Sequence, residues 1–178
     1  MNTCEAIRMI HMTNRVVFRK SDLRRLLGGG ASAEKTIERL VYGEILLRAA
    51  RGVYVYDLAR DKGDVLYAVA RNLRRGEAVY ESFTSAAALR GLISQSAAGL
   101  NLATSGSSHR FDTPYGSIEF IHVPNAFETV NDAASCTRRT REGIPLATDQ
   151  TILADCERNR RAVSLIKEEK DRDRNGYR

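Results

Sequence analysis

Three consecutive glycines, Gly28–Gly30, constrain the fold of this chain more than any other feature. They begin the stretch GGGASAEKT, in which Lys35 and Thr36 stand side by side as they do in a phosphate-binding loop. Such a loop has a glycine directly before the lysine, and it joins a strand to a helix. Here Glu34 occupies the glycine position, and its carboxylate would repel phosphate. A nucleotide site is therefore rejected as the interpretation of this stretch.

The glycines instead separate two predicted helices. In FRKSDLRRLL, Ser21 is suited to cap a short helix whose leucines share one face, and Asp22 suits the positive end of the helix dipole. In SAEKTIERLVYG, Ser32 is suited to cap a second helix that ends at Gly43. Two helices joined by a tight turn containing glycine form a helix-turn-helix, whose second helix enters the major groove of DNA.

A β-hairpin is predicted directly after these helices. The segment EILLRAARGVYVYD holds two β-prone runs around a turn that contains Gly52. A helix over 3–12 and a short strand over 15–18 precede the helix pair. The order helix, strand, helix, helix, hairpin is that of a winged helix, with Arg51 at the tip of the wing and Arg48 on its first strand.

Basic residues gather in the same part of the chain. The 178 residues carry a net charge of +6, and residues 1–60 hold eleven Lys or Arg against six Asp or Glu. Such residues neutralise DNA phosphates, while side chains on the second helix reach base edges. The candidate DNA contacts are Lys20, Ser21, Ser32, Lys35, Thr36, Arg39, Arg48 and Arg51. A winged helix that serves only protein contacts is the alternative.

Residues 61–178 are expected to form a second domain, a small α+β domain with a mostly antiparallel sheet and a charged C-terminal tail. The first domain is thus assigned to residues 1–60. The second domain is expected to begin with a charged linker around residues 61–63, followed by a helix over about 64–73. The other expected elements are strands over 77–82 and 99–106, a helix over 84–93, a hairpin over 108–124, and a late helix starting at Thr148 or Asp149.

The sequence predicts neither an enzyme nor a metal or cofactor site. Ser82, Thr84 and Ser85 lack the G-x-S-x-G surroundings of a nucleophile. His109 and His122 flank the hairpin turn and are interpreted as structural. The cysteines Cys4, Cys136 and Cys156 are far apart, without C-x-x-C spacing, and are expected to be free thiols.

The sequence also gives an expectation for location. No apolar run is long enough to cross a bilayer, and residues 1–15 lack the apolar stretch of a signal peptide. A cytoplasmic protein without membrane contacts is expected.

Four segments, taken in their order, resemble the AbiEi-type antitoxins of bacteria. In that family, a helix with serine near its start and L-x-x-x-G-L near its end follows the winged helix. The corresponding stretch here, Ser85–Leu92, starts with serine but ends in L-R-G-L. In the family, P-L-A also leads into a late helix that contains Asp, here Asp155. The four segments are Leu40–Tyr56, Glu81–Ile93, Thr113–Val123 and Gly143–Cys156.

The resemblance implies an antitoxin encoded beside a toxin with a nucleotidyltransferase fold. The winged helix would bind repeats in its own promoter and repress the operon. The C-terminal region would counteract the toxin, in many members without stable contact between the two proteins. The runner-up is a stand-alone winged-helix transcriptional regulator whose C-terminal domain senses a ligand or a partner. An enzyme would need a set of catalytic side chains within residues 64–160, and the sequence shows no such set.

Overall fold

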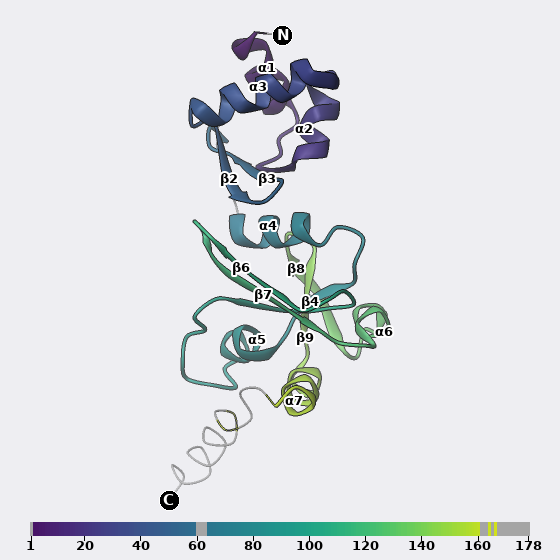
Figure 1. The fold of residues 1–178 in the computed structure, drawn as a ribbon. Helices are drawn as coiled ribbons and strands as arrows, with labels where there is room; N and C mark the ends of the chain where they lie inside the picture. The colour runs from purple at the N-terminus through teal and green to yellow at the C-terminus, as the bar shows by residue number, and fades with distance from the viewer. Residues whose placement is uncertain (1, 60–63, 161–163, 165, 167–178) are drawn as a thin grey trace, which may run out of the picture. The chain divides into compact units, whose positions relative to one another are not determined.

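The computed structural model describes residues 2–59, 64–160, 164 and 166, and it divides the chain into two units (Figure 1). The first unit comprises Met1–Arg75 together with Thr113–Tyr115. The second comprises Gly76–Asp112 and Gly116–Arg178. Helices and strands occur in both units, so the chain is α+β, as predicted.

The first unit contains four helices and a three-stranded antiparallel sheet among its described residues, with the strands in the order β1-β3-β2. The order of elements predicted for residues 1–56 is confirmed. The elements are α1 (Thr3–Met12), β1 (Val17–Arg19), α2 (Lys20–Leu26), α3 (Gly30–Tyr42), β2 (Leu46–Ala50), β3 (Val53–Tyr56) and α4 (Val65–Leu73).

Ser21 and Ser32 are not helix caps, contrary to the prediction. The chain passes from β1 directly into α2, so Ser21 is the second residue of that helix, and no side chain caps it. Helix α3 begins at Gly30, and Gly29 precedes it with a φ of 74°. Glycine adopts this conformation without strain, so the helix can start at Gly30, two residues before Ser32. The glycine run thus separates two helices, as predicted, with Gly30 as the first residue of the second.

The core of the first unit lies between the three N-terminal helices and the sheet. Helix α3 contributes Ala33, Ile37 and Leu40, which recur at helical spacing and are almost fully buried. The other buried members of this cluster come from the remaining helices and strands: Ala6, Ile10, Phe18, Leu23, Leu27, Leu46, Tyr54 and Tyr56. The buried face of α3 fixes which of its side chains point outward.

Helix α4 belongs with the first unit, whereas the sequence assigns it to a second domain that begins at residue 61. It packs against β1 and β3, and the Arg19 side chain on β1 donates a hydrogen bond to the carbonyl of Asn72. The boundary between the units therefore falls after Arg75. The linker predicted around residues 61–63 and the predicted charged C-terminal tail lie outside the described residues.

The second unit is built on a six-stranded sheet with the order β6-β7-β5-β4-β9-β8. All of the elements predicted for this region are present, but α6, β8 and β9 were not predicted. The elements are β4 (Val79–Glu81), α5 (Phe83–Leu89), β5 (Leu100–Thr104), β6 (His109–Thr113), β7 (Gly116–His122), α6 (Ala126–Asn131), β8 (Cys136–Arg141), β9 (Ile144–Ala147) and α7 (Asp149–Arg158).

The sheet is mixed, where the sequence predicts a mostly antiparallel one. Strand β4 is antiparallel to β5 but parallel to β9, and β5 is parallel to β7. The parallel pairs arise because β6 turns back at the sheet edge and because β9 returns from far along the chain to lie beside β4. The outer pair, β8 and β9, is antiparallel.

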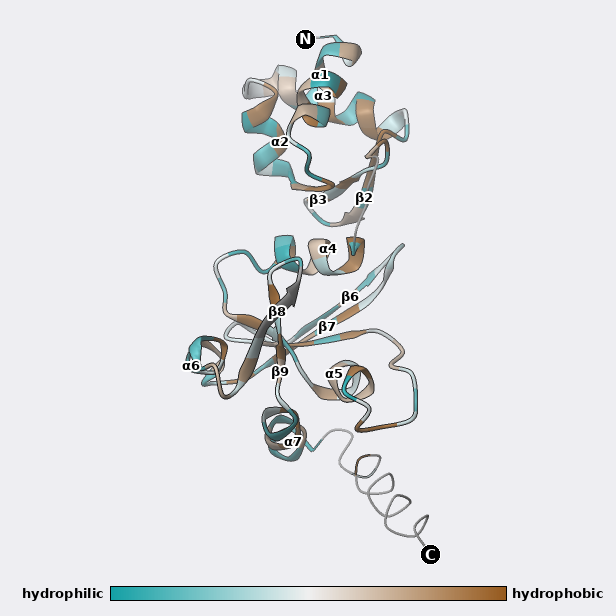
Figure 2. Ribbon diagram, turned by 180° about the vertical axis from the view of Figure 1, so that it is seen from behind, coloured by the Kyte–Doolittle hydropathy of each residue, from teal (hydrophilic) through white to brown (hydrophobic). Residues whose placement is uncertain are grey.

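Helices pack onto this sheet through small and aromatic side chains. Tyr80, Phe83, Ala103 and Ile152 belong to one buried cluster that joins β4, β5, α5 and α7. Figure 2 shows hydrophobic residues along β9 and on α5. Cys136 and Cys156 lie in the same cluster, and burial raises the pKa of their thiols to about 12 and about 11, so both are protonated at neutral pH.

Candidate nucleic-acid interface

The outward face of α3 carries a group of polar side chains above an open hollow. One helical residue turns about 100° from the next, so positions spaced by three and four share a face. Ser32, Lys35, Arg39 and Tyr42 follow that spacing, and all four are exposed. With Glu38 they line the hollow. Tyr42 is 93% exposed, which is unusual for a large aromatic side chain. The sequence reasoning missed Glu38 and Tyr42, although the same spacing identifies them.

Thr36 does not belong to this exposed face, contrary to the prediction. It is only 1% exposed, because its place on the helix is next to the apolar face. Its hydroxyl donates to the carbonyl of Ser32 at 2.9 Å and accepts from a terminal nitrogen of Arg39 at 3.2 Å. Thr36 therefore cannot reach a base, but it helps to hold the guanidinium of Arg39 on the surface.

Lys20 and Ser21 lie at the start of α2, and both are exposed. The ammonium group of Lys20 lies 2.6 Å from a carboxylate oxygen of Glu34 on α3, and the Arg24 guanidinium lies 3.0 Å from the other oxygen. The hydrogen bond to Glu34 raises the pKa of Lys20. These two ion pairs hold α2 against α3. A phosphate can therefore bind Lys20 only in competition with the Glu34 carboxylate.

The hairpin β2–β3 presents two exposed arginines. Arg48 lies on β2, at a register irregularity between Arg48 and Ala50, and Arg51 lies in the turn. The backbone N–H of Lys20 donates to the carbonyl of Gly52 at 2.8 Å, which attaches the turn to the start of α2. Both arginines keep the exposed positions that the sequence predicts.

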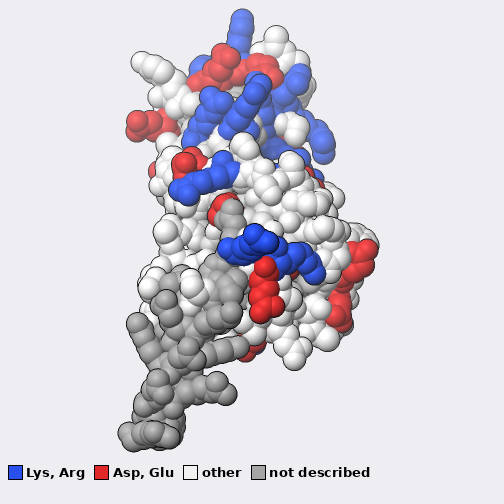
Figure 3. Space-filling model, turned by 60° about the horizontal axis from the view of Figure 1, so that its bottom comes forward, with Lys and Arg blue, Asp and Glu red and all other residues white. Residues whose placement is uncertain are grey.

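Charges on the first unit are mixed but mainly basic. Figure 3 shows Lys and Arg side chains close together on this unit, with some Asp and Glu between them. The exposed Lys35, Arg39, Arg48 and Arg51 contribute to this charge. A surface of this kind attracts polyanions, and the attraction weakens as salt increases.

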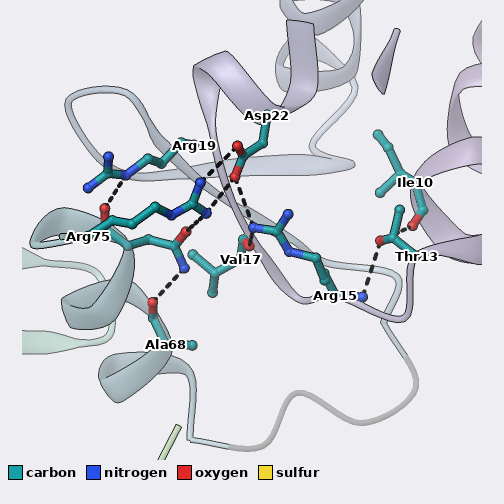
Figure 4. Close-up of polar contacts among 9 residues, drawn as sticks. Ile10, Thr13, Arg15, Val17, Arg19, Asp22, Ala68 and Arg75 are labelled. Carbon is teal, nitrogen blue, oxygen red and sulfur yellow. Dashed lines mark hydrogen bonds and ion pairs between the residues drawn. The ribbon is translucent and has the colours of Figure 1, made fainter. Parts of the chain in front are cut away.

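A second charged cluster, centred on Asp22, was missed by the sequence reasoning. Asp22 accepts hydrogen bonds from Arg75 at 2.9 and 2.7 Å and from Arg15 at 3.0 Å (Figure 4). The Arg75 hydrogen bonds contribute most to lowering the pKa of Asp22 far below its usual range. The Arg15 guanidinium also lies 4.9 Å from the centre of the Phe18 ring. This cluster joins α2, α4 and the segment before β1.

The second unit contains a buried carboxylate, Asp155, on α7. One of its oxygens accepts hydrogen bonds from the Tyr80 hydroxyl and from the Ser82 hydroxyl, each at 2.8 Å. Arg158 lies 4.0 Å from the other oxygen. Burial raises the pKa of Asp155 despite these partners. The cluster connects α7 to β4 and fits a structural role.

The remaining polar groups considered from the sequence are also held in place. His122 is exposed, and its Nδ1 lies 2.8 Å from the Gly106 carbonyl. Asp149 pairs with Arg90 at 2.6 Å.

Within the described ranges, no group of three or more His, Cys, Asp or Glu side chains is arranged to hold a metal ion. Among the helices of those ranges, none is long and apolar enough to span a bilayer.

Comparisons with known proteins bear on the fold. No protein-family model and no curated protein matches the sequence. Among solved structures, the chain is similar to the RV2827C protein from Mycobacterium tuberculosis, with 17% identity and a TM-score of 0.62. The similarity covers 86% of this chain and 59% of that protein, so this chain spans less than two thirds of its length. At this identity, the likeness shows a shared fold.

Proposed function

We propose that the first unit is a winged helix-turn-helix that binds double-stranded DNA, with α3 as the recognition helix and the β2–β3 hairpin as the wing. The observation that carries this proposal is the division of α3 into two faces. Ala33, Ile37 and Leu40 are buried, while Lys35 and Arg39 line an open hollow on the exposed side. A helix anchored on one side and polar on the other fits the major groove.

The hairpin supports the same function. Arg51 lies in its turn, and the backbone contact between Lys20 and Gly52 keeps that turn beside α2. An arginine at a wing tip contacts phosphate and contributes affinity that does not depend on sequence. In this arrangement Ser32, Lys35 and Arg39 meet base edges, while Arg48 and Arg51 meet the backbone.

The test of DNA binding uses fluorescence anisotropy with a labelled duplex from the region upstream of the gene and an unrelated duplex of the same length. Arg39→Ala is expected to weaken binding to the upstream duplex by ~1–3 kcal/mol and to reduce the preference over the unrelated duplex. Arg110→Ala is the matched control, since it removes one exposed arginine from the second unit. Equal affinity of the Arg39 variant and the unaltered protein for the upstream duplex would exclude α3 as the recognition helix.

We further propose that the chain is a cytoplasmic antitoxin that represses its own operon and counteracts a nucleotidyltransferase-like toxin. The support is the ordered resemblance to AbiEi-type antitoxins. Its four segments coincide with elements of the fold: the end of α3 with the hairpin, α5 with the residues beside it, β7, and β9 with α7. The chain is assigned no catalytic step, and its role rests on binding.

A growth assay tests the antitoxin role. The gene adjacent to this one is placed under an inducible promoter, and the full-length chain is expressed from a foreign promoter, so that autoregulation does not change its level. The unaltered chain is expected to restore growth. The full-length double variant Lys35→Ala/Arg39→Ala is expected to derepress the native promoter and still protect, because residues that contact DNA need not contact the toxin.

Protein levels must be matched by immunoblot, since a less stable variant could fail through degradation alone. Loss of protection by the double variant at normal abundance would show that α3 also takes part in neutralisation. Promoter repression without any protection would instead favour a stand-alone transcriptional regulator.

A further inference from the structure

Two glutamates on α3, one helical turn apart, have different surroundings. Glu34 is held by Lys20 at 2.6 Å and by Arg24 at 3.0 Å, so its charge is neutralised within the protein. Glu38 is exposed and lines the hollow beside Lys35 and Arg39. Within the part of the chain that the structure describes, no ion pair holds the Glu38 carboxylate.

An unpaired carboxylate on a DNA-facing surface has an unfavourable effect on binding in general. Each phosphate that it approaches repels it, and this repulsion opposes the attraction from Lys35 and Arg39. A carboxylate can offset that repulsion by accepting a hydrogen bond from a base. In the major groove, the N4 amino group of cytosine is the donor that matches a carboxylate, whereas guanine offers only the acceptors N7 and O6.

We propose that Glu38 is a specificity-determining residue that selects cytosine in the bound DNA by accepting a hydrogen bond from its N4 amino group. This inference rests on the proposed DNA binding through α3. Arg39 and Lys35, which share the hollow with Glu38, carry the donors that match the O6 and N7 atoms of guanine. The preferred site therefore contains G·C pairs where α3 enters the groove.

The chemistry of the side chain predicts how two substitutions differ. Alanine at position 38 removes both the acceptor and the charge, so the cytosine preference disappears while binding to unrelated duplexes becomes tighter. Glutamine keeps the size but presents an amide, which pairs with the N6 and N7 atoms of adenine. Glu38→Gln is therefore expected to change the selected base from cytosine to adenine, with a discrimination of about tenfold in each case.

The experiment is a selection from a pool of random DNA duplexes, followed by sequencing of the bound fraction, with the full-length protein. The variants are Glu38→Ala, Glu38→Gln and the control Glu5→Gln. Glu5 is an exposed carboxylate on α1 that does not line the hollow, so this control makes the same change in charge. Anisotropy titrations with the selected duplex and its single-base variants then give the fold-change at each position.

The expected result is one position at which the unaltered protein and Glu5→Gln select cytosine, Glu38→Ala selects no base, and Glu38→Gln selects adenine. If the Glu38 variants select the same sequences as the unaltered protein, Glu38 is a solvated residue and the inference is wrong, while DNA binding stands. If the unaltered protein binds no duplex more tightly than another, or binds none, the proposed sequence-specific DNA binding fails as well. The binding of the unaltered protein therefore distinguishes failure of the Glu38 inference from failure of the proposed DNA binding.

Discussion

Asp22 and Arg75 form a two-pronged ion pair, in which both terminal nitrogens of the arginine donate to the carboxylate, at 2.9 and 2.7 Å. The two residues are 53 positions apart in the sequence. Asp22 lies in the first turn of α2, and Arg75 lies just beyond the end of α4. The pair therefore holds α4 on the helices and strands that precede it.

Asp22→Asn should weaken the attachment of α4. Because Arg75 and Arg15 lower the pKa of Asp22, the carboxylate stabilises the fold fully above about pH 4, and this stabilisation is lost as the pH falls toward the lowered value. At pH 7 the loss should be about 1 kcal/mol, since both arginines are nearly half exposed. Hydrogen exchange of the α4 amides measures it, and the difference from the unaltered protein should narrow below about pH 4.

Asp112→Asn is the control for that measurement, since Asp112 forms an exposed pair with Arg110 in the second unit. Unchanged exchange in α4 for the Asp22 variant at pH 7 would mean that apolar packing alone holds this helix.

The stability that Asp155 contributes should depend on pH in the opposite sense to that of Asp22. Burial raises its pKa in the folded state, so the folded protein takes up a proton more readily than the unfolded chain. The contribution of this group to stability is therefore greatest at low pH and falls as the pH rises from about 4 through the raised value. Denaturant unfolding between pH 4 and 7 should show the unaltered protein losing stability relative to Asp155→Asn. A difference between the two proteins that stays constant over this pH range would contradict the prediction.

Gly29→Ala should destabilise the first unit by about 1 kcal/mol through backbone strain alone. The residue has a φ of 74°, which is unfavourable for alanine, but an added Cβ would meet no atom within 4 Å. Because the combination of φ 74° and ψ −177° is adopted almost only by glycine, Gly29→Asn should lose about as much as Gly29→Ala. Thermal unfolding of the three proteins measures the losses, and a much smaller loss for the asparagine variant would contradict this cause.

Arg51→Ala should weaken binding to all duplexes alike. An arginine that neutralises one phosphate contributes about one to the slope of log K against log salt, so the slope should become shallower by that amount. Anisotropy titrations at several salt concentrations measure this slope for the upstream duplex and for an unrelated one. A loss confined to the upstream duplex would instead place Arg51 on a base edge.

Local patterns predicted the first unit well. The helices and the hairpin follow from apolar spacing and from glycines at the turns, which act over a few residues. Thr36 was misplaced because it lies at the border between the two faces of α3, where spacing alone does not decide exposure. The Asp22–Arg75 pair was missed because the fold, and no local pattern, brings these residues together.

The second unit was harder to predict for the same reason. Strand β9 is only four residues long and contains Pro145, so its sequence is a weak strand signal. Strand β9 pairs with its neighbour β4 through Leu146 on β9 and Glu81 on β4, which are far apart in the chain. Parallel pairing of this kind depends on the whole fold, and the sequence of either strand alone does not show it.

The position of β4 between β5 and β9 has a consequence for synthesis on the ribosome. Strand β4 can pair with β5 once Thr104 has emerged, but its other edge stays open until Ile144–Ala147 follows. The intervening stretch of about 40 residues takes roughly 2–8 s to translate. During that interval the nascent chain exposes a strand edge that can pair with another chain. Pausing or premature termination in this stretch therefore leaves the second unit open to aggregation.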